Sequence, residues 1–291
     1  MGHAQLSGRG RKRLLSGHPW IYADDVTTVA GAEAGALVAV RAPDESHLGW
    51  ALFSTKSRIA LRLVTRAEEE PQREFWRLRA QRAVAHRRAL GLLAPRDACR
   101  LLSGDADGFP GLVLDRYADA LVLQSGCQGS DSFRDLWLEC VLEALDVPVT
   151  SILDRSDSST RTHEELEKRV EWLRGERSEP LEVQEAPRAD VPALSYEVSL
   201  TEGHKTGHYL DQRENRARAA RFAKGARVLD AFSYDGLFAV RAALAGAKDV
   251  LCIDQSEVAL ERALRNAERN GVAGKLRVEK KNAMHDLRER A

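Results

Sequence analysis

Cysteine is scarce in this sequence, and no two cysteines have the CxxC spacing of a zinc or redox site. The cysteines of the chain are Cys99, Cys127, Cys140 and Cys252. They lie mostly in apolar segments, so we expect buried thiols in a reducing compartment, with no disulfide framework and no metal site. Long apolar runs are also lacking, since none approaches the roughly 20 residues that span a bilayer. The polar start of the chain is unlike a signal peptide, so the sequence predicts a cytoplasmic protein without a membrane partner.

An excess of charge is lacking as well, because Lys plus Arg and Asp plus Glu both number 44. Net charge therefore predicts no general affinity for polyanions. The distribution is uneven, however: residues 1–66 carry nine Lys or Arg against five Asp or Glu. Four of these cations, Arg9, Arg11, Lys12 and Arg13, stand together without an acid between them. Such a basic segment can contact the phosphates of a nucleic acid, although a solvated surface explains it equally well.

The sequence divides into three predicted domains, consistent with its 291 residues and 43% hydrophobic content. Residues 1–70 contain short apolar or alternating runs separated by turn residues, at 35–40, 49–53 and 59–64. This spacing indicates a small β-barrel. The charged, proline-broken joint from Glu68 to Pro71 suits a domain boundary.

Residues 71–190 mix helical and strand-like patterns, which predicts a central α+β module. We expect a helix over 74–90, a hairpin of 111–114 and 120–124, a helix through Phe133 and Ala144, and a strand at 151–154. Thr162 and Glu165 have the spacing of a capping box, so we predict a further helix that ends by Gly175. A polar region over 180–192 would end the module.

Residues 191–291 alternate between strand and helix in the manner of a doubly wound α/β domain. Predicted strands at 228–231, 250–254 and 276–279 are separated by predicted helices at 237–245 and 257–270. Before them we expect a strand at 198–200 and a charged helix at 211–222. Because the third strand lies close to Ala291, we expect only the first half of a Rossmann-like domain here.

The ends of these strands are the predicted ligand site, because a parallel sheet binds ligands outside the carboxyl ends of its strands. Phe232 and Tyr234 offer stacking surface, Gly236 allows close backbone approach, and Asp254 can accept hydrogen bonds from two ribose hydroxyls. The GxGxxG pattern that cradles a pyrophosphate is lacking. This favours a nucleoside without phosphates, such as S-adenosylmethionine, over a dinucleotide; the alternative is an ordinary βα turn.

A polar, glycine-bearing loop, GHKTGHYLDQR at 203–213, precedes the Rossmann-like strands. It could fold over a cofactor, with Lys205 facing a carboxylate and Gln212 hydrogen-bonded to it. The alternative is a solvent loop before a charged helix. His204 and His208 show no metal-ligand pattern, and we favour surface or loop roles for both.

Several long motifs together resemble the bacterial large-subunit ribosomal RNA cytosine-5 methyltransferases. They are GHPWIYADDV (17–26), STKSRIALRLVT (54–65), GDADGFPGLVLDRYADALVLQ (104–124), GHKTGHYLDQREN (203–215) and VLDAFSYDGLFAV (228–240). The resemblance runs in the same order over nearly all of the chain. It implies an N-terminal PUA domain, a class I methyltransferase fold, S-adenosylmethionine as cofactor and 23S ribosomal RNA as partner, with 5-methylcytosine as product.

The resemblance also implies roles for residues of the cofactor site. Lys205, Gln212 and Arg213 would hold the methionine end of the cofactor, and Asp254 would hold the ribose. The turn around it would be formed by Phe232, Ser233, Tyr234 and Gly236. Asn282 stands where the family has an acid that contacts the adenine amine. The PUA resemblance favours RNA contact for the basic segment at Arg9–Arg13.

Methylation of cytosine at C5 requires a thiolate that adds to C6. In the family this cysteine lies later in the catalytic domain, so we expect it beyond residue 291, and none of the four cysteines present is predicted to be the nucleophile. We therefore expect this chain to lack catalytic activity alone. One alternative is a noncatalytic RNA-binding protein with a vestigial cofactor domain. Another is a small-molecule methyltransferase that a second chain completes, and a homodimer is left open.

Overall fold

The computed structural model describes residues 2–185 and 191–290. The chain divides into two compact units, the first comprising Met1–Leu93 and Cys99–Arg177, and the second comprising Ala94–Ala98 and Ser178–Ala291. Within the described ranges, no helix combines the length and the apolar character that crossing a membrane requires. All four cysteines are buried free thiols, as predicted.

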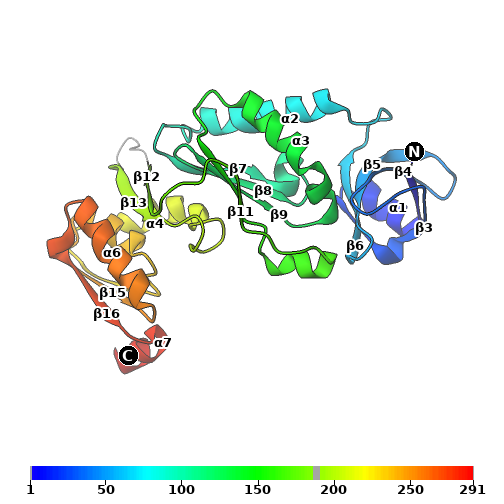
Figure 1. The fold of residues 1–291 in the computed structure, drawn as a ribbon. Helices are drawn as coiled ribbons and strands as arrows, with labels where there is room; N and C mark the ends of the chain where they lie inside the picture. The colour runs from blue at the N-terminus through cyan, green and yellow to red at the C-terminus, as the bar shows by residue number, and fades with distance from the viewer. Residues whose placement is uncertain (1, 186–190, 291) are drawn as a thin grey trace. The chain divides into compact units, whose positions relative to one another are not determined.

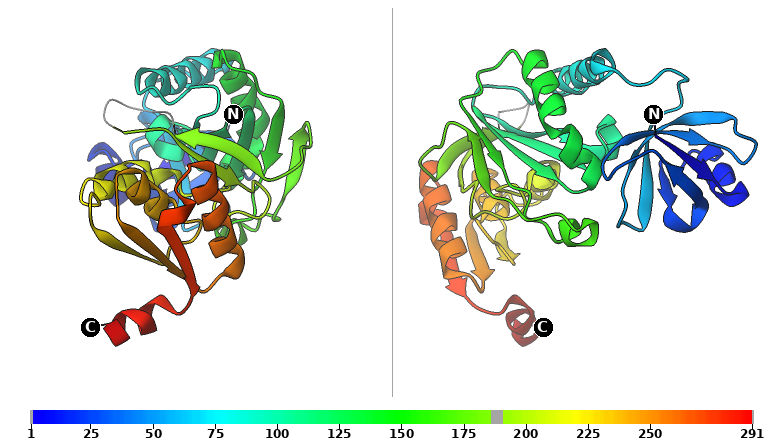
Figure 2. Two further views of the ribbon diagram at one scale, coloured as in Figure 1. Left: turned by 90° about the vertical axis from the view of Figure 1, so that its left-hand side faces the viewer. Right: turned by 45° about the vertical axis from the view of Figure 1, so that its right-hand side comes forward.

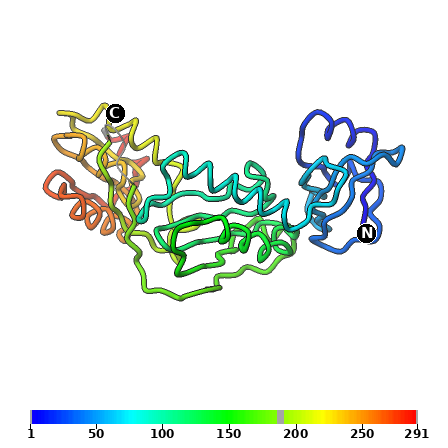
Figure 3. The backbone as a smooth tube through the Cα atoms, turned by 90° about the horizontal axis from the view of Figure 1, so that it is seen from above, coloured from blue at the N-terminus to red at the C-terminus, as the bar shows by residue number. Residues whose placement is uncertain are grey.

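The first unit begins with a six-stranded sheet in the order β2-β6-β5-β4-β1-β3, drawn in blue in Figure 3. The strands are β1 (His3–Leu6), β2 (Trp20–Tyr22), β3 (Val26–Ala30), β4 (Leu37–Arg41), β5 (His47–Phe53) and β6 (Ile59–Thr65). The three predicted strands are confirmed as β4, β5 and β6. Helix α1 (Gly8–Leu15) carries the basic segment and begins at Ser7, whose hydroxyl accepts a hydrogen bond from the Gly10 amide.

A five-stranded sheet in the order β11-β10-β9-β8-β7 follows in the same unit. Its strands are β7 (Ala98–Ser103), β8 (Leu112–Tyr117), β9 (Ala120–Ser125), β10 (Ser151–Asp154) and β11 (Glu171–Arg174). Helices α2 (Arg73–Ala89) and α3 (Gln128–Ala144) lie side by side on one face of the sheet, as Figures 1 and 2 show. Trp76 and Trp137, both fully buried, meet between them with ring centroids 5.0 Å apart. The two predicted helices and the predicted hairpin are confirmed.

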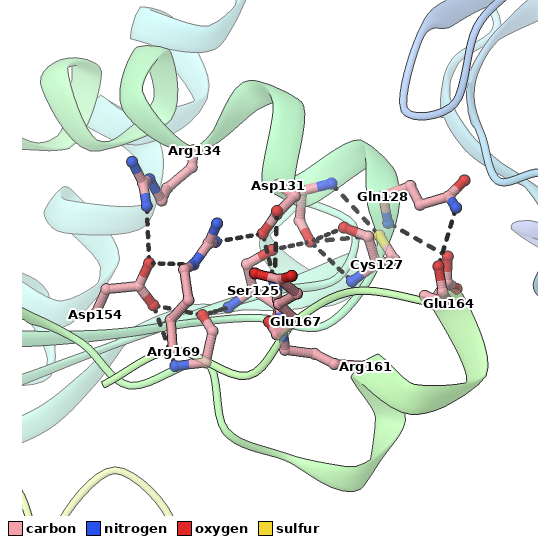
Figure 4. Close-up of polar contacts among 12 residues, drawn as sticks. Ser125, Cys127, Gln128, Asp131, Arg134, Asp154, Arg161, Glu164, Glu167 and Arg169 are labelled. Atoms are coloured by element: carbon pink, nitrogen blue, oxygen red, sulfur yellow. Dashed lines mark hydrogen bonds and ion pairs between the residues drawn. The ribbon is translucent and has the colours of Figure 1, made fainter. Parts of the chain in front are cut away.

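The predicted helix from Thr162 to Gly175 is wrong. A 3-10 helix (Ser159–Glu164) ends at Glu165, which has a left-handed φ of 53°, and an irregular segment then leads into β11. Figure 4 shows the cause, a network of ion pairs that fixes this segment against α3 and β10. Arg161 donates to the Asp131 carboxylate at 2.8 Å, and Arg169 donates to it at 2.6 Å. These long-range ion pairs outweigh the local capping pattern.

The second unit contains an antiparallel hairpin and a parallel sheet. The hairpin pairs β12 (Leu181–Glu185) with β13 (Leu194–Val198). Part of the region predicted to be a polar linker is therefore a strand, while residues 186–190 lie outside the described ranges. The strand predicted at 198–200 lies four residues earlier, as β13.

The parallel sheet has the order β14-β15-β16, formed by β14 (Arg227–Ala231), β15 (Asp249–Asp254) and β16 (Leu276–Lys280). Its helices are α4 (Arg213–Ala220), α5 (Leu237–Leu244), α6 (Glu257–Arg269) and α7 (Ala283–Arg290). Ser256 caps α6 as predicted, because its hydroxyl accepts from the Ala259 amide. All three predicted strands and both helices between them are confirmed, and α7 was not predicted. The carboxyl ends of β14 and β15 therefore meet at one edge, where a ligand site was expected.

The network around Asp131 should dominate the stability of the first unit. Asp131→Ala would leave the Arg161 guanidinium, whose side chain is 1% exposed, without its carboxylate. We expect the free energy of unfolding to fall by about 3 kcal/mol, the range for removing one partner of a buried ion pair. Urea unfolding followed by circular dichroism measures this. Asp135→Ala, which removes a largely exposed carboxylate of the same helix, should cost less than about 1 kcal/mol; equal losses would contradict the assignment.

Candidate cofactor-binding site

The turn between β14 and α5 has a strained backbone. Phe232 and Tyr234 have left-handed φ angles of 59° and 49°, which are unfavourable for bulky side chains. Gly236 has a φ of 72°, and a Cβ atom there would lie 2.6 Å from the Cβ atom of Ala263 in α6. Glycine is thus required at this position so that α5 can begin against α6. Strain of this kind persists only where the surroundings fix the backbone, and it is typical of binding sites.

Asp254, the last residue of β15, fixes this turn. One carboxylate oxygen accepts from the Tyr234 amide at 2.9 Å, and the other accepts from the Ser256 amide at 2.9 Å. The Ser233 amide also donates to the Ile253 carbonyl at 3.1 Å. A carboxylate can accept further hydrogen bonds beyond these two, so Asp254 can still receive ribose hydroxyls.

Asp230, the penultimate residue of β14, accepts a hydrogen bond at 3.1 Å from the Ala239 amide in the first turn of α5. Burial, together with the neighbouring charges of Asp235 and Asp254, raises the pKa of Asp230 to about 7. The carboxyl group is therefore partly protonated near neutral pH. Its role in the structure is to satisfy a free amide at the start of α5.

Aromatic side chains from the loop at 203–213 meet the turn. The ring centroid of His204 lies 4.8 Å from that of Tyr234, and that of Tyr209 lies 5.7 Å from it. Of the surface or loop role expected for His208, the surface part is wrong: the residue lies in the loop, but its side chain is buried and its Nδ1 lies 2.9 Å from the Asp235 carboxylate. The loop thus folds over the strand ends, as the cofactor interpretation of its sequence requires.

These elements enclose a cavity of about 590 Å³ within the second unit. A volume of this size suits a nucleoside-sized ligand. The lining residues come from the loop, the turn, α4, α5 and the end of β15: His204, His208, Tyr209, Gln212, Arg216, Phe232, Ser233, Tyr234, Asp235, Leu237, Phe238, Asp254, Gln255 and Ser256.

The structure brings together five of the nine predicted cofactor residues in this lining: Gln212, Phe232, Ser233, Tyr234 and Asp254. Gly236 acts through the backbone of the turn instead. The other three are engaged elsewhere.

Lys205 pairs with Asp211 at 3.0 Å, and Arg213 makes two hydrogen bonds to Asp97 at 2.9 and 3.2 Å. Asn282 accepts from the His285 amide and so caps α7. Cofactor contact by these three residues stays a prediction.

Arg216 was missed by the sequence prediction, although its side chain is 2% exposed and lines the cavity. Its spacing of three residues from Arg213 on a charged helix gave no sign that it turns inward. His208 and Asp235 were missed for a similar reason, since their pairing joins segments 27 positions apart in the sequence.

The cavity residues fit S-adenosylmethionine in chemistry. Asp254 supplies a carboxylate for ribose hydroxyls, and the aromatic rings supply apolar and stacking surface. Arg216 supplies a buried cation, and its Nε donates no hydrogen bond to any described residue.

The basic segment lies on α1 in the first unit. Arg9 and Arg13, one turn apart, both donate at 2.5 Å to Asp25, whose side chain is fully buried. With Tyr22, Ala23, Asp24 and Arg58 they line a depression of about 300 Å³, and the Arg13 guanidinium lies 4.9 Å from the Tyr22 ring centroid. Arg11 and Lys12 are exposed on the same helix. RNA contact by these four residues stays a prediction.

Two family models match the chain. The model of the PUA-like domain matches residues 4–66, and that of the S-adenosylmethionine-dependent methyltransferases matches residues 159–281. The chain therefore has an α/β fold with an N-terminal PUA-like domain and an S-adenosylmethionine-dependent methyltransferase domain. S-adenosylmethionine, the predicted cofactor, is the one this domain class uses. The predicted domain boundaries at residues 70 and 190 remain predictions.

Relatives of known name are similar over most of the chain. Two proteins named Ribosomal RNA large subunit methyltransferase I, from Shewanella denitrificans and Shewanella frigidimarina, are 39% and 38% identical to it over 268 residues. Each alignment covers 90% of this chain and 66% of the relative. The prediction that the chain holds only the first half of the cofactor domain is not confirmed by these matches.

Solved structures share the fold. One described as a candidate S-adenosylmethionine-dependent methyltransferase from Streptococcus mutans has a TM-score of 0.80 at 20% identity, covering 99% of this chain and 73% of its own. A second, a candidate methyltransferase solved with S-adenosylhomocysteine, has a TM-score of 0.82 at 20% identity, covering 99% and 72%. These likenesses show the arrangement of the chain and not its reaction.

The raised pKa of Asp230 predicts a pH-dependent stability. The folded state holds this proton more tightly than the unfolded state, so the contribution is present at low pH and is lost as the pH rises towards 7. Between pH 5 and pH 8 the wild-type protein should lose about 3 kcal/mol relative to Asp230→Asn, at about 1.4 kcal/mol for each of the two pH units below the folded-state pKa. Urea unfolding at each pH measures the difference.

Asp249→Asn is the control for that series, because Arg277 holds the pKa of the exposed Asp249 below its ordinary value. Its stability difference from wild type should not change over this pH range. Parallel curves for Asp230→Asn and wild type would show that burial does not perturb Asp230.

Proposed function

We propose that the protein binds S-adenosylmethionine in the cavity at the ends of β14 and β15 and acts in the methylation of large-subunit ribosomal RNA. The observation that carries the proposal is the Asp254 carboxylate, which holds the strained turn and borders a nucleoside-sized cavity. The match of residues 159–281 to a methyltransferase family supports the cofactor. The names of the similar proteins support the substrate.

The finer proposal is that the substrate is 23S ribosomal RNA and the product 5-methylcytosine. It rests on the motifs that resemble the cytosine-5 methyltransferases, at 203–215 and 228–240. In this division of labour the PUA-like sheet and α1 contact RNA, while the second unit holds the methyl donor. The alternative, a noncatalytic RNA-binding protein, would use only the RNA contacts of the PUA-like sheet and α1.

None of the four cysteines has the character of the required nucleophile. All are buried, and burial together with the nearby Asp230 raises the pKa of the Cys252 thiol well above its ordinary value. A thiolate and not a thiol attacks, so this residue is inert. Cys252 instead lies fully buried in β15.

Methyl transfer tests the reaction. The protein is incubated with unmodified 23S ribosomal RNA and isotopically labelled S-adenosylmethionine, and the digested nucleosides are identified by mass spectrometry. The cytosine-5 proposal predicts label in 5-methylcytidine, and because the four buried thiols do not supply the thiolate, label there would mean that the nucleophile comes from elsewhere. Label in another nucleoside would contradict the cytosine-5 proposal, and cofactor and RNA binding without any transfer would favour the noncatalytic alternative.

RNA binding by α1 is tested by removing two cationic side chains that could contact phosphates. Arg11→Gln with Lys12→Gln, which removes two exposed cations of α1 and leaves the partners of the buried Asp25 in place, should reduce the salt dependence of the RNA dissociation constant by roughly 1.4 in slope, at about 0.7 for each contact to single-stranded RNA. Fluorescence anisotropy at several salt concentrations gives the slope. The matched pair Arg82→Gln with Arg88→Gln removes two exposed charges from α2; an equal change there would mean that only net charge matters.

A further inference from the structure

Arg216 is the one lysine or arginine among the described residues that line the cofactor cavity. It comes from α4, and its side chain is 2% exposed. The cavity also carries two carboxylates, on Asp235 and Asp254. Both would repel a ligand carboxylate. Arg216 is therefore the side chain of this lining that can attract one by a fixed positive charge.

The ion-pair cluster that contains Arg216 holds more cations than carboxylates. Glu185, on β12, is shared by Arg216 and by Arg241 of α5, and all three side chains are 2–3% exposed. Two guanidinium groups thus surround one carboxylate. The hydrogen bonds of the cluster are consistent with an ionised Glu185, since the two arginines lower its pKa although burial opposes this. The cluster itself therefore has one cation more than it has carboxylates, which favours the approach of another anion.

The hydrogen bonds of Arg216 leave it able to receive that anion. It donates to Glu185 through Nη2 and, with a longer bond of 3.4 Å, to the Tyr209 carbonyl through Nη1. Its buried Nε has no acceptor among the described residues. A guanidinium can donate five hydrogen bonds, so donors remain for a carboxylate at the cavity wall.

The other cations near the site are committed to protein partners. Arg213 is held by two hydrogen bonds to Asp97, and Arg262 donates to the Tyr234 hydroxyl at 3.2 Å. Lys205 pairs with Asp211, with its side chain 42% exposed. None of these three lines the cavity as the structure describes it.

We propose that Arg216 binds the carboxylate at the amino-acid end of the cofactor, with Glu185 and Arg241 as residues that position it. The assignment rests on the proposed function, because it takes the cavity to hold S-adenosylmethionine. A planar guanidinium suits this task, since it can give a carboxylate two parallel hydrogen bonds. The predicted carboxylate partner, Lys205, would then have at most a secondary role.

The experiment is calorimetric titration of the 291-residue protein with two ligands. S-adenosylhomocysteine carries the carboxylate, and 5′-methylthioadenosine is a nucleoside thioether without the amino-acid part. For Arg216→Gln we expect the dissociation constant of S-adenosylhomocysteine to rise about 10- to 100-fold, as for loss of a charged hydrogen bond. The dissociation constant of 5′-methylthioadenosine should change less than about threefold.

Two further variants separate recognition from folding. Arg216→Lys keeps a positive charge but loses the two parallel donors of the guanidinium. It should therefore weaken the binding of S-adenosylhomocysteine by less than Arg216→Gln does, and leave the binding of 5′-methylthioadenosine unchanged. Arg218→Gln removes an exposed arginine of the same helix and should affect neither ligand. Thermal unfolding of each variant shows whether the fold is retained.

The outcomes are distinct. If both Arg216 variants weaken the binding of both ligands equally, Arg216 only supports the fold. If Lys205→Gln weakens the binding of S-adenosylhomocysteine selectively and Arg216→Gln does not, Lys205 is the residue that binds the carboxylate. Either result overturns the assignment. Wild-type protein that binds neither ligand would contradict the proposed function, and the assignment with it.

Discussion

The hydrogen bonds of Asp254 are the constraint on which the second unit depends. Its carboxylate ties the turn after β14 to the start of α6 by accepting from the Tyr234 and Ser256 amides. Because the turn contains two bulky residues with left-handed φ angles, it would relax without this support. One carboxylate thus both shapes the turn and lines the cavity.

Buried charge is the second organising feature of this unit. Glu185 of β12 forms ion pairs with both α4 and α5. Arg213, the first residue of α4, also pairs with Asp97. Ion pairs that are buried contribute less to stability than their Coulomb attraction suggests, because both partners lose water. Their effect here is geometric: they orient α4 so that Arg216 reaches the cavity.

The sequence predicts the periodic elements well and the long-range contacts poorly. Helix α6 follows from its apolar spacing and its Ser256 cap, and the place of Asp254 follows from the end of an apolar strand. The helix predicted from Thr162 fails because Arg161 and Arg169 are bound by carboxylates of α3 and β10. Arg213 was expected to contact the cofactor, yet its partner Asp97 lies 116 positions away in the sequence. No local pattern indicates such a partner.

The central claim is that the ends of β14 and β15 form a nucleoside site. A crystal structure of the protein with S-adenosylhomocysteine tests it most directly. We expect the ribose hydroxyls within hydrogen-bond distance of Asp254, and the adenosine in contact with the turn at 232–236. Ligand density elsewhere, for example in the separate groove lined by Phe222, Leu229 and Ala242, would contradict the account.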